Sequence, residues 1–332
     1  MTHGPLKQRI LVLALLVAGA AQAELLRDPQ WQGWLDAGKT QELERAAQAR
    51  LAIQPDDAQA AVALAMSALD GAEAQRLEAA QKPVQSCVER QPTLAICHYA
   101  LGSLQGAQAI TGGMMKAISL SGRIKENFSR AVELDPLLYE ARSALVEFYL
   151  LAPGVAGGSM AKARELAQAA QVRQPEHAKL LRARIAAQDS NWAEVQRELT
   201  SVRAGSDQSL QIELRDTWFQ LGVQLFGDKQ FAKARGVFEQ IQRDYPTHAN
   251  GAYGMGRVLT ETGQIDEAIK VLERARTLEG ADRLPVDHRL AIALLAKGEK
   301  AQAKVALERF VGNKRANPRN LEDARKRLAE LG

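Results

Sequence analysis

The sequence predicts an all-α protein, an α-solenoid built from stacked antiparallel helix pairs. Two consecutive helix-turn-helix units in residues 216–280 repeat in register, because Gly222 and Gly256 lie 34 residues apart and so do Ala234 and Ala268. A unit of this length cannot bury its apolar face alone and must stack on its neighbours. The composition agrees, since 46% of the residues are hydrophobic and only 5% are aromatic, which suits closely packed helices. A chain of 332 residues is long for one compact domain, but a solenoid is free of that limit.

The first unit resembles the tetratricopeptide repeat (TPR), whose consensus is W-x-x-L-G-x-x-Y, then A-x-x-x-F, then P. Its matching positions hold Trp218, Leu221, Gly222, Leu225, Ala234, Phe238 and Pro246, with Leu225 in place of Tyr. The resemblance implies a TPR-type superhelix with a concave groove. We expect Gly222 and Ala234 to face each other where the two helices cross, because small residues let backbones approach closely. The alternative is an ordinary helical bundle with two similar hairpins, and the shared register argues against it.

Residues 1–23 are predicted to be a signal peptide that is not part of the fold. Lys7 and Arg9 precede a short apolar run at residues 10–18, and a small-x-small site, Ala-Gln-Ala, ends at Ala23. The run is shorter than the about 20 apolar residues that a membrane-spanning helix needs. We therefore expect cleavage after Ala23, and a periplasmic or alternatively secreted bacterial protein with no transmembrane segment after signal removal. A signal anchor that stays uncleaved is the alternative.

The period divides the rest of the chain into eight hairpins and a cap. We expect degenerate N-terminal helical repeats at 24–92, TPR-like repeats with two Gly-rich insertions at 93–212, three well-matched TPR repeats at 213–317 and a C-terminal capping helix at 318–332. In the first hairpin, Trp31 and Trp34 are expected to cover the exposed end of the core, since terminal repeats of such arrays are atypical.

Two Gly-rich insertions interrupt the period, at residues 111–113 and 153–158, and the sequence leaves open whether they are functional. The run from Ser159 to Lys162 that follows the second insertion matches S-x-x-K, the Ser/Lys pair of penicillin-binding enzymes. Neither S-D-N nor K-T-G accompanies it. We interpret Ser159 as the N-cap of a helix, where its hydroxyl accepts from a backbone N–H group.

Cys87 and Cys97 are the only cysteines, and an even count after a signal peptide favours a disulfide. In the TPR register Cys87 lies late in one second helix and Cys97 lies early in the next first helix, so the two helices should be neighbours. Two free buried thiols are one alternative. A metal site with His98 is another, but it lacks a clear fourth ligand.

Charge and motifs argue against nucleic-acid binding and catalysis. Without residues 1–23, which contribute two of the 43 basic residues, 41 basic residues face 39 acidic ones, and this balance gives no electrostatic footprint for nucleic acid. H-E-x-x-H and a nucleophile–base constellation are missing from the sequence, so we expect no enzyme activity, no cofactor and no metal.

The leading hypothesis is a periplasmic scaffold that binds a protein or peptide of unknown identity in its groove. One alternative is a structural subunit of an envelope assembly that binds through its convex face or its ends. Another is an enzyme that uses the Gly-rich insertions as the rim of an active site.

The TPR resemblance also implies which residues line the groove. The register of the two clear repeats gives Asp216, Phe219, Val223, Phe226, Asn250, Tyr253, Arg257 and Glu261, and a looser alignment adds Tyr99, Glu147, Arg184 and His288. Chaperone-binding TPR proteins hold a carboxylate with Lys and Asn at two of these positions. Here Phe219 and Val223 stand there in one repeat, and Tyr253 and Arg257 in the next, so that clamp is not supported. The alternative for Phe219 and Phe226 is that both only pack against neighbouring repeats.

Overall fold

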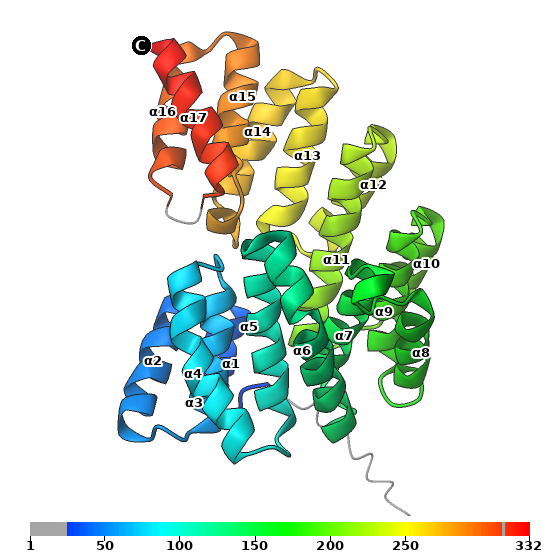
Figure 1. Ribbon diagram of the computed structural model, residues 1–332. Coiled ribbons are helices and arrows are strands. Elements are labelled where there is room, and N and C mark those ends of the chain that lie inside the picture. Colours follow the sequence, from blue (N-terminus) through cyan, green and yellow to red (C-terminus); the bar gives the residue numbers. More distant parts are fainter. Residues whose placement is uncertain (1–24, 314–315) are drawn as a thin grey trace, which may run out of the picture.

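The computed structural model describes residues 25–313 and 316–332 (Figure 1). Within this part the chain forms seventeen α-helices, two short 3-10 helices and no β-strand. The helices follow one another as eight antiparallel pairs and a last single helix, and each helix packs on the next. The predicted all-α solenoid of stacked helix pairs is therefore confirmed. The predicted signal peptide lies outside the described residues.

The pairs run in chain order along the array. The first four are α1 (Pro29–Asp36) with α2 (Thr40–Ile53), α3 (Ala58–Leu69) with α4 (Ala74–Arg90), α5 (Ala95–Thr111) with α6 (Gly113–Leu134), and α7 (Tyr139–Leu151) with α8 (Met160–Ala170). The next four are α9 (Pro175–Gln188) with α10 (Trp192–Ser201), α11 (Gln208–Gly227) with α12 (Phe231–Asp244), α13 (Ala249–Glu261) with α14 (Ile265–Arg276), and α15 (Val286–Lys297) with α16 (Lys300–Val311). The 3-10 helices η1 (Gly154–Ala156) and η2 (Ala281–Arg283) lie in connections, and α17 (Pro318–Leu331) ends the array.

The core is elongated because each pair buries its apolar face against its neighbours. Buried apolar side chains form three successive clusters, in the N-terminal pairs, in the middle pairs and from α9 to α17. At the N-terminal end Trp31 is buried in the first cluster, and Trp34 packs against it from the outside. Both Trp side chains thus cover the end of the core, as the sequence predicts.

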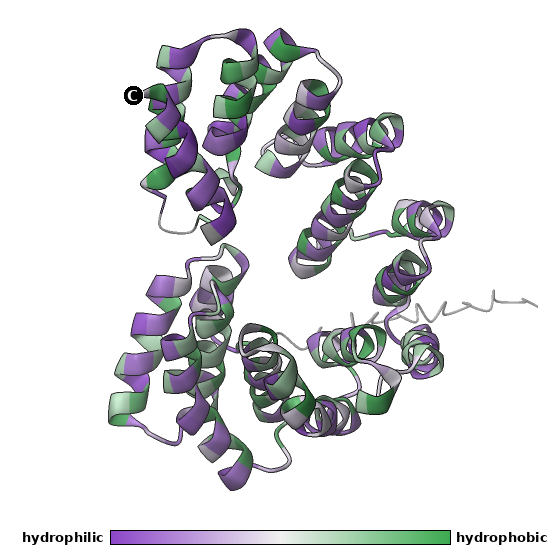
Figure 2. Ribbon diagram, turned by 45° about the horizontal axis from the view of Figure 1, so that its top comes forward, coloured by the Kyte–Doolittle hydropathy of each residue, from purple (hydrophilic) through white to green (hydrophobic). Residues whose placement is uncertain are grey.

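The array curves with the first helix of each pair on the inside. The first helices of successive pairs contact one another along the array, more than the second helices do, so they occupy the shorter inner path. Figure 2 shows the curve of the array. The curvature brings the turn between α1 and α2 close to η2, where Arg283 Nη2 donates to the backbone oxygen of Gly38 at 3.3 Å. The superhelix therefore returns toward its own beginning.

Glycines set the spacing between the helices of the C-terminal half. An added Cβ on Gly222 would lie 2.5 Å from Phe238 Cε1, and one on Gly254 in the next pair would lie 2.2 Å from the same ring. The Phe238 ring, one helical turn after Ala234 on α12, thus fills the space beside Gly222. The ring needs a glycine on each side, since a methyl group there would overlap it.

The two Gly-rich insertions have different structures. The first does not form a separate loop, because its residues extend α5 and α6 to 17 and 22 residues and leave a tight turn at Gly112. The second is a compact loop around η1, closed by hydrogen bonds from Gly158 N to Pro153 O and from Ser159 N to Tyr149 O. Ser159 Oγ accepts from Lys162 N at 3.3 Å and caps α8, so the N-cap interpretation is confirmed.

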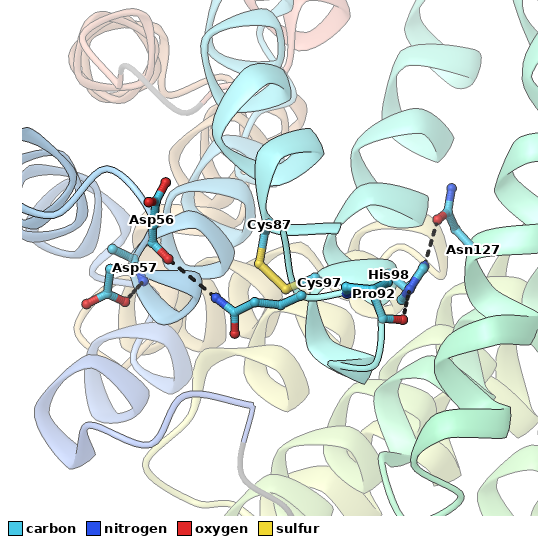
Figure 3. The surroundings of a disulfide bond; sticks show 9 residues. Asp56, Asp57, Cys87, Pro92, Cys97, His98 and Asn127 are labelled. Carbon is cyan, nitrogen blue, oxygen red and sulfur yellow. Dashed lines mark hydrogen bonds between the residues drawn. A yellow bond between two sulfur atoms is a disulfide. The ribbon is translucent and has the colours of Figure 1, made fainter. Parts of the chain in front are cut away.

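A disulfide joins Cys87 near the end of α4 to Cys97 near the start of α5, with 5.7 Å between the Cα atoms (Figure 3). The predicted bridge between consecutive repeats is therefore present, and the alternatives that need free thiolates fall away. His98 beside it lies 3.2 Å from Asn127 Oδ1 through Nδ1 and 3.0 Å from Pro92 O through Nε2. Both ring nitrogens of His98 are thus occupied by protein groups.

Helix α11 departs from the repeat. It begins at Gln208, capped by the Asp207 carboxylate, well before the predicted register at Asp216. Helix α10 packs less extensively on α11 than the other second helices do on the helices that follow them.

No helix in the described part of the chain is long and apolar enough to cross a membrane.

Candidate inner-face binding site

The inner face carries two groups of side chains, one in each half of the array. In the middle of the chain, α5, α7, α9 and α11 contribute ionisable residues that are mostly buried. In the C-terminal half, α11 and α13 contribute aromatic residues and a guanidinium group. Because adjacent first helices contact one another, the side chains of each group come together from separate repeats.

The middle group is centred on an ion pair between Arg184 and Glu213. Arg184 Nη2 lies 2.7 Å from Glu213 Oε1, and Arg184 Nη1 donates to Ser143 Oγ at 2.6 Å. Tyr139 donates its hydroxyl to the same carboxylate oxygen at 2.6 Å. The network joins α7, α9 and α11, and it holds Arg184 against its own chain, so this guanidinium is not free to bind a partner.

Next to this network lies a small acidic cavity of about 330 Å³, lined by α1, α7, α9 and the segment before α11. Asp36, Glu140 and Asp207 are among its lining residues. Burial raises the pKa of Glu140 to about 7, a backbone hydrogen bond opposes this, and the negative charges of Glu213 and Asp36 add to it. The carboxyl of Glu140 therefore changes its protonation state near neutral pH.

The C-terminal group is an aromatic surface around Arg257. The Arg257 guanidinium carbon lies 4.2 Å from the centroid of the Phe226 ring and 5.7 Å from that of Tyr253. Phe219 joins these residues with its ring centroid 6.1 Å from that of Tyr253. The guanidinium thus rests on two aromatic faces, an arrangement that attracts a cation to the rings.

Arg257 makes no salt bridge among the described residues, although the Glu261 carboxylate on the same helix acts on its charge. Its Nε atom is buried without a hydrogen-bond partner, and so is Nε of Arg289 on α15. Burial lowers the pKa of Arg257 and the nearby charge of Arg289 adds to this, while Tyr253 and the carboxylate of Glu261 oppose it. A partly buried cation with unused donors is costly for the free protein, and a carboxylate from a partner would offset that cost.

Most of the predicted groove residues are at least partly accessible, but three are not. Glu147 and Glu261 are exposed, and Asn250, Tyr253 and His288 are buried. The remaining seven are partly exposed: Tyr99, Arg184, Asp216, Phe219, Val223, Phe226 and Arg257. Most of the residues that the TPR register assigns to the groove are thus accessible to a partner.

His288 must be removed from the candidate groove. Helix α17 covers it, with His288 Nε2 2.6 Å from Asp323 Oδ2, and its ring packs against Phe310. Asn250 donates to Asp216 Oδ1 at 3.3 Å and serves the protein's own contacts. The burial of Tyr253 means that it supports the surface from below.

Both interpretations of the two phenylalanines hold in part. Phe219 packs on Phe238 and Tyr253, and Phe226 packs edge-on against Phe231 with ring centroids 5.5 Å apart. Each ring nevertheless remains partly exposed. The rings are therefore anchored by neighbouring repeats and still offer one side to a partner.

The sequence argument missed Tyr139, Glu140 and Glu213. Glu213 lies in the extra N-terminal turns of α11, outside the TPR register, so no repeat position pointed to it. Tyr139 and Glu140 begin α7, whose repeat matches the consensus loosely. The available signal was a tyrosine and a carboxylate next to each other at the start of one helix.

The match to known repeats is strongest in the same C-terminal half. Residues 225–284 match the model of the tetratricopeptide repeat family. Curated proteins gave no match to the chain.

Solved structures share the fold at low sequence identity. The crystal structure of yeast Tom70 has a TM-score of 0.61 and 13% identity, over 89% of this chain and 60% of that one. The Cut9–Hcn1 hetero-tetramer of the APC/C has a TM-score of 0.47 and 15% identity, over 91% and 54%. The chain thus spans little more than half the length of either protein. At such identities the likeness to Tom70 supports the TPR-type solenoid fold alone.

Proposed function

We propose that this protein is a non-enzymatic scaffold that holds a segment of another protein on the inner face of its C-terminal repeats. Arg257 is the observation that carries the proposal, because it is partly buried on two aromatic rings, makes no salt bridge in the described chain and has a buried Nε without a hydrogen-bond partner. Its ligand is an extended or helical segment with an Asp or Glu side chain, or a free carboxyl terminus, next to apolar residues. The aromatic rings supply contact area, and the guanidinium supplies a charge-assisted hydrogen bond.

The experiment compares Arg257→Glu with Arg274→Glu. Arg274 is an exposed arginine on α14, the outer helix of the same pair, so it controls for the change in net charge. Partners are cross-linked to the immobilised protein in a periplasmic extract, identified by mass spectrometry, purified and titrated by calorimetry. We expect Arg257→Glu to weaken binding of the identified partner by at least about tenfold, or about 1.4 kcal/mol, and Arg274→Glu to leave it unchanged. Equal affinities of both variants and the wild type would refute the inner-face site.

The scaffold is proposed to act after export to the periplasm. The support is the predicted signal peptide, with its cleavage site after Ala23, and a disulfide that suits an oxidising compartment. N-terminal sequencing of the protein recovered from the envelope should begin at Glu24. A cytoplasmic protein that retains Met1 would contradict export.

A further inference from the structure

The turn between α5 and α6 carries a cluster of exposed apolar side chains. Ile110 is 81% exposed, Met114 and Met115 are each 80% exposed, and Ile118 is 60% exposed. These four residues are here called the apolar knob. Single exposed apolar residues are normal on a soluble protein, but a group of large ones marks an interaction surface.

The four knob side chains lie where the two long helices of this repeat meet. The extra residues of the repeat lengthen both helices, and the knob side chains at their ends stay exposed while Ala109 and Leu120 beside them are buried. The turn is tight, because a Cβ on Gly112 would lie 2.7 Å from Gln108 O and Gly113 has a φ of +77°. Two residues without side chains at the tip leave the apolar side chains on both flanks uncovered.

The neighbouring repeat carries two further exposed apolar side chains on the same edge of the array. The loop between α7 and α8 is also a turn between the two helices of a pair, and its η1 segment contacts α6. Val155 in η1 is fully exposed, and Leu151 at the end of α7 is 64% exposed. The compact hydrogen bonding of this loop keeps Val155 at its surface.

The segments that form these two turns carry only positive charges. Residues 95–125 and 148–164 contain no Asp or Glu, and their basic residues are Lys116, Arg123, Lys125, Lys162 and Arg164. In the described chain only Arg164 among these takes part in an ion pair, with Asp189 at 3.0 Å. Lys125 lies beside the second loop, since its Nζ is 3.4 Å from the Cβ position of Gly157. The other four cations of these two segments thus make no ion pair in the described chain.

We propose that the apolar knob docks on the surface of an anionic lipid bilayer. A protruding turn needs a deep pocket in a protein partner, whereas a bilayer surface deforms around it and accepts unbranched Met side chains among its acyl chains. The unpaired cations are attracted to anionic headgroups, and the apolar side chains add burial at the boundary between headgroups and acyl chains. The scaffold would then be held at a membrane by its third and fourth repeats, leaving the inner face of the C-terminal repeats free.

The test measures sedimentation of the purified protein with vesicles of phosphatidylcholine that contain about 30% phosphatidylglycerol. We expect binding to these vesicles, weaker binding to phosphatidylcholine alone, and loss of binding as salt rises from about 0.1 M to about 0.5 M. Met114→Ser with Met115→Ser should weaken binding by about tenfold, and Lys116→Glu with Lys125→Glu should do the same. All variants keep the same residues 1–24, so that segment cannot produce the difference between them.

The matched control is Ile53→Ser with Val172→Ser, at apolar residues that are 79% and 86% exposed elsewhere on the protein. It should bind like the wild type, and circular dichroism should show the same melting temperature for all variants. The proposal is overturned if the wild type does not sediment with anionic vesicles, or if the knob and control variants lose binding equally. Light scattering that shows a dimer which only the knob variant dissociates, without vesicle binding, would assign the knob to a second copy of the chain instead.

Discussion

Replacing Gly222 with Ala tests the helix packing on which the solenoid depends. The new Cβ would lie 2.5 Å from Phe238 Cε1, whereas ordinary contact begins at 3.4 Å, so the ring would have to move by about 0.9 Å. The ring has no free space to shift into, because Phe238 is fully buried and the backbone of Gly254 lies against its other side. Overpacking of this kind costs about 2–3 kcal/mol, and the better helix propensity of Ala returns about 1 kcal/mol at most. We expect a net loss of about 1–2 kcal/mol.

The assay is denaturant unfolding followed by circular dichroism, with Gly227→Ala as the matched control. Gly227 ends the same helix, is exposed, and has nothing within 4 Å of its Cβ position. Its replacement should leave stability unchanged or raise it by up to about 1 kcal/mol. Gly222→Leu should cost more than Gly222→Ala, because the larger side chain enters the same space. If the two alanine variants shifted the midpoint equally, the packing described for Phe238 would be wrong.

Three further predictions concern the N-terminal and middle repeats. The pKa of Glu140 rises from its ordinary 4.5 to about 7 on folding, so the folded state binds the proton more tightly and stability falls by up to about 3 kcal/mol as pH rises through that window. Glu140→Gln should remove this part of the pH dependence, and unfolding midpoints at about pH 5 and pH 8 measure it; an unchanged pH profile would show that Glu140 is solvated. Glu213→Ala leaves Arg184 and Tyr139 without their shared acceptor and should cost about 3 kcal/mol, whereas Glu147→Ala at an exposed site should cost less than about 0.5 kcal/mol in the same unfolding assay. Cys87→Ser with Cys97→Ser should lower the free energy of unfolding by about 3 kcal/mol, since the bridge closes a loop with a sequence separation of 10 residues. Wild-type protein that unfolds identically with and without reductant would argue against a stabilising bridge.

Much of the architecture could be predicted from the sequence, because in a repeat protein the residues that pack neighbouring helices recur at a fixed spacing along the chain. Gly222, Gly256, Ala234 and Ala268 recur at one spacing since each pair must fit its neighbour in the same way. The same register placed Phe219 and Arg257 on the inner face, and it brought the two cysteines to neighbouring helices. These inferences need only the contacts between adjacent repeats, which lie close in the chain.

What the sequence could not supply depends on contacts outside that period. Glu213 reaches Tyr139 and Arg184 from turns of α11 that have no counterpart in the repeat, and His288 is hidden by a capping helix that follows the last pair. The first insertion could as well have been a loop, and only its continuation of two long helices exposes the apolar knob. By itself the sequence determined the repeating unit and its stacking, because these follow from local spacing. The tertiary structure alone decided which polar groups meet and which surfaces stay open, because the curvature of the whole array and the departures from its period set those distances.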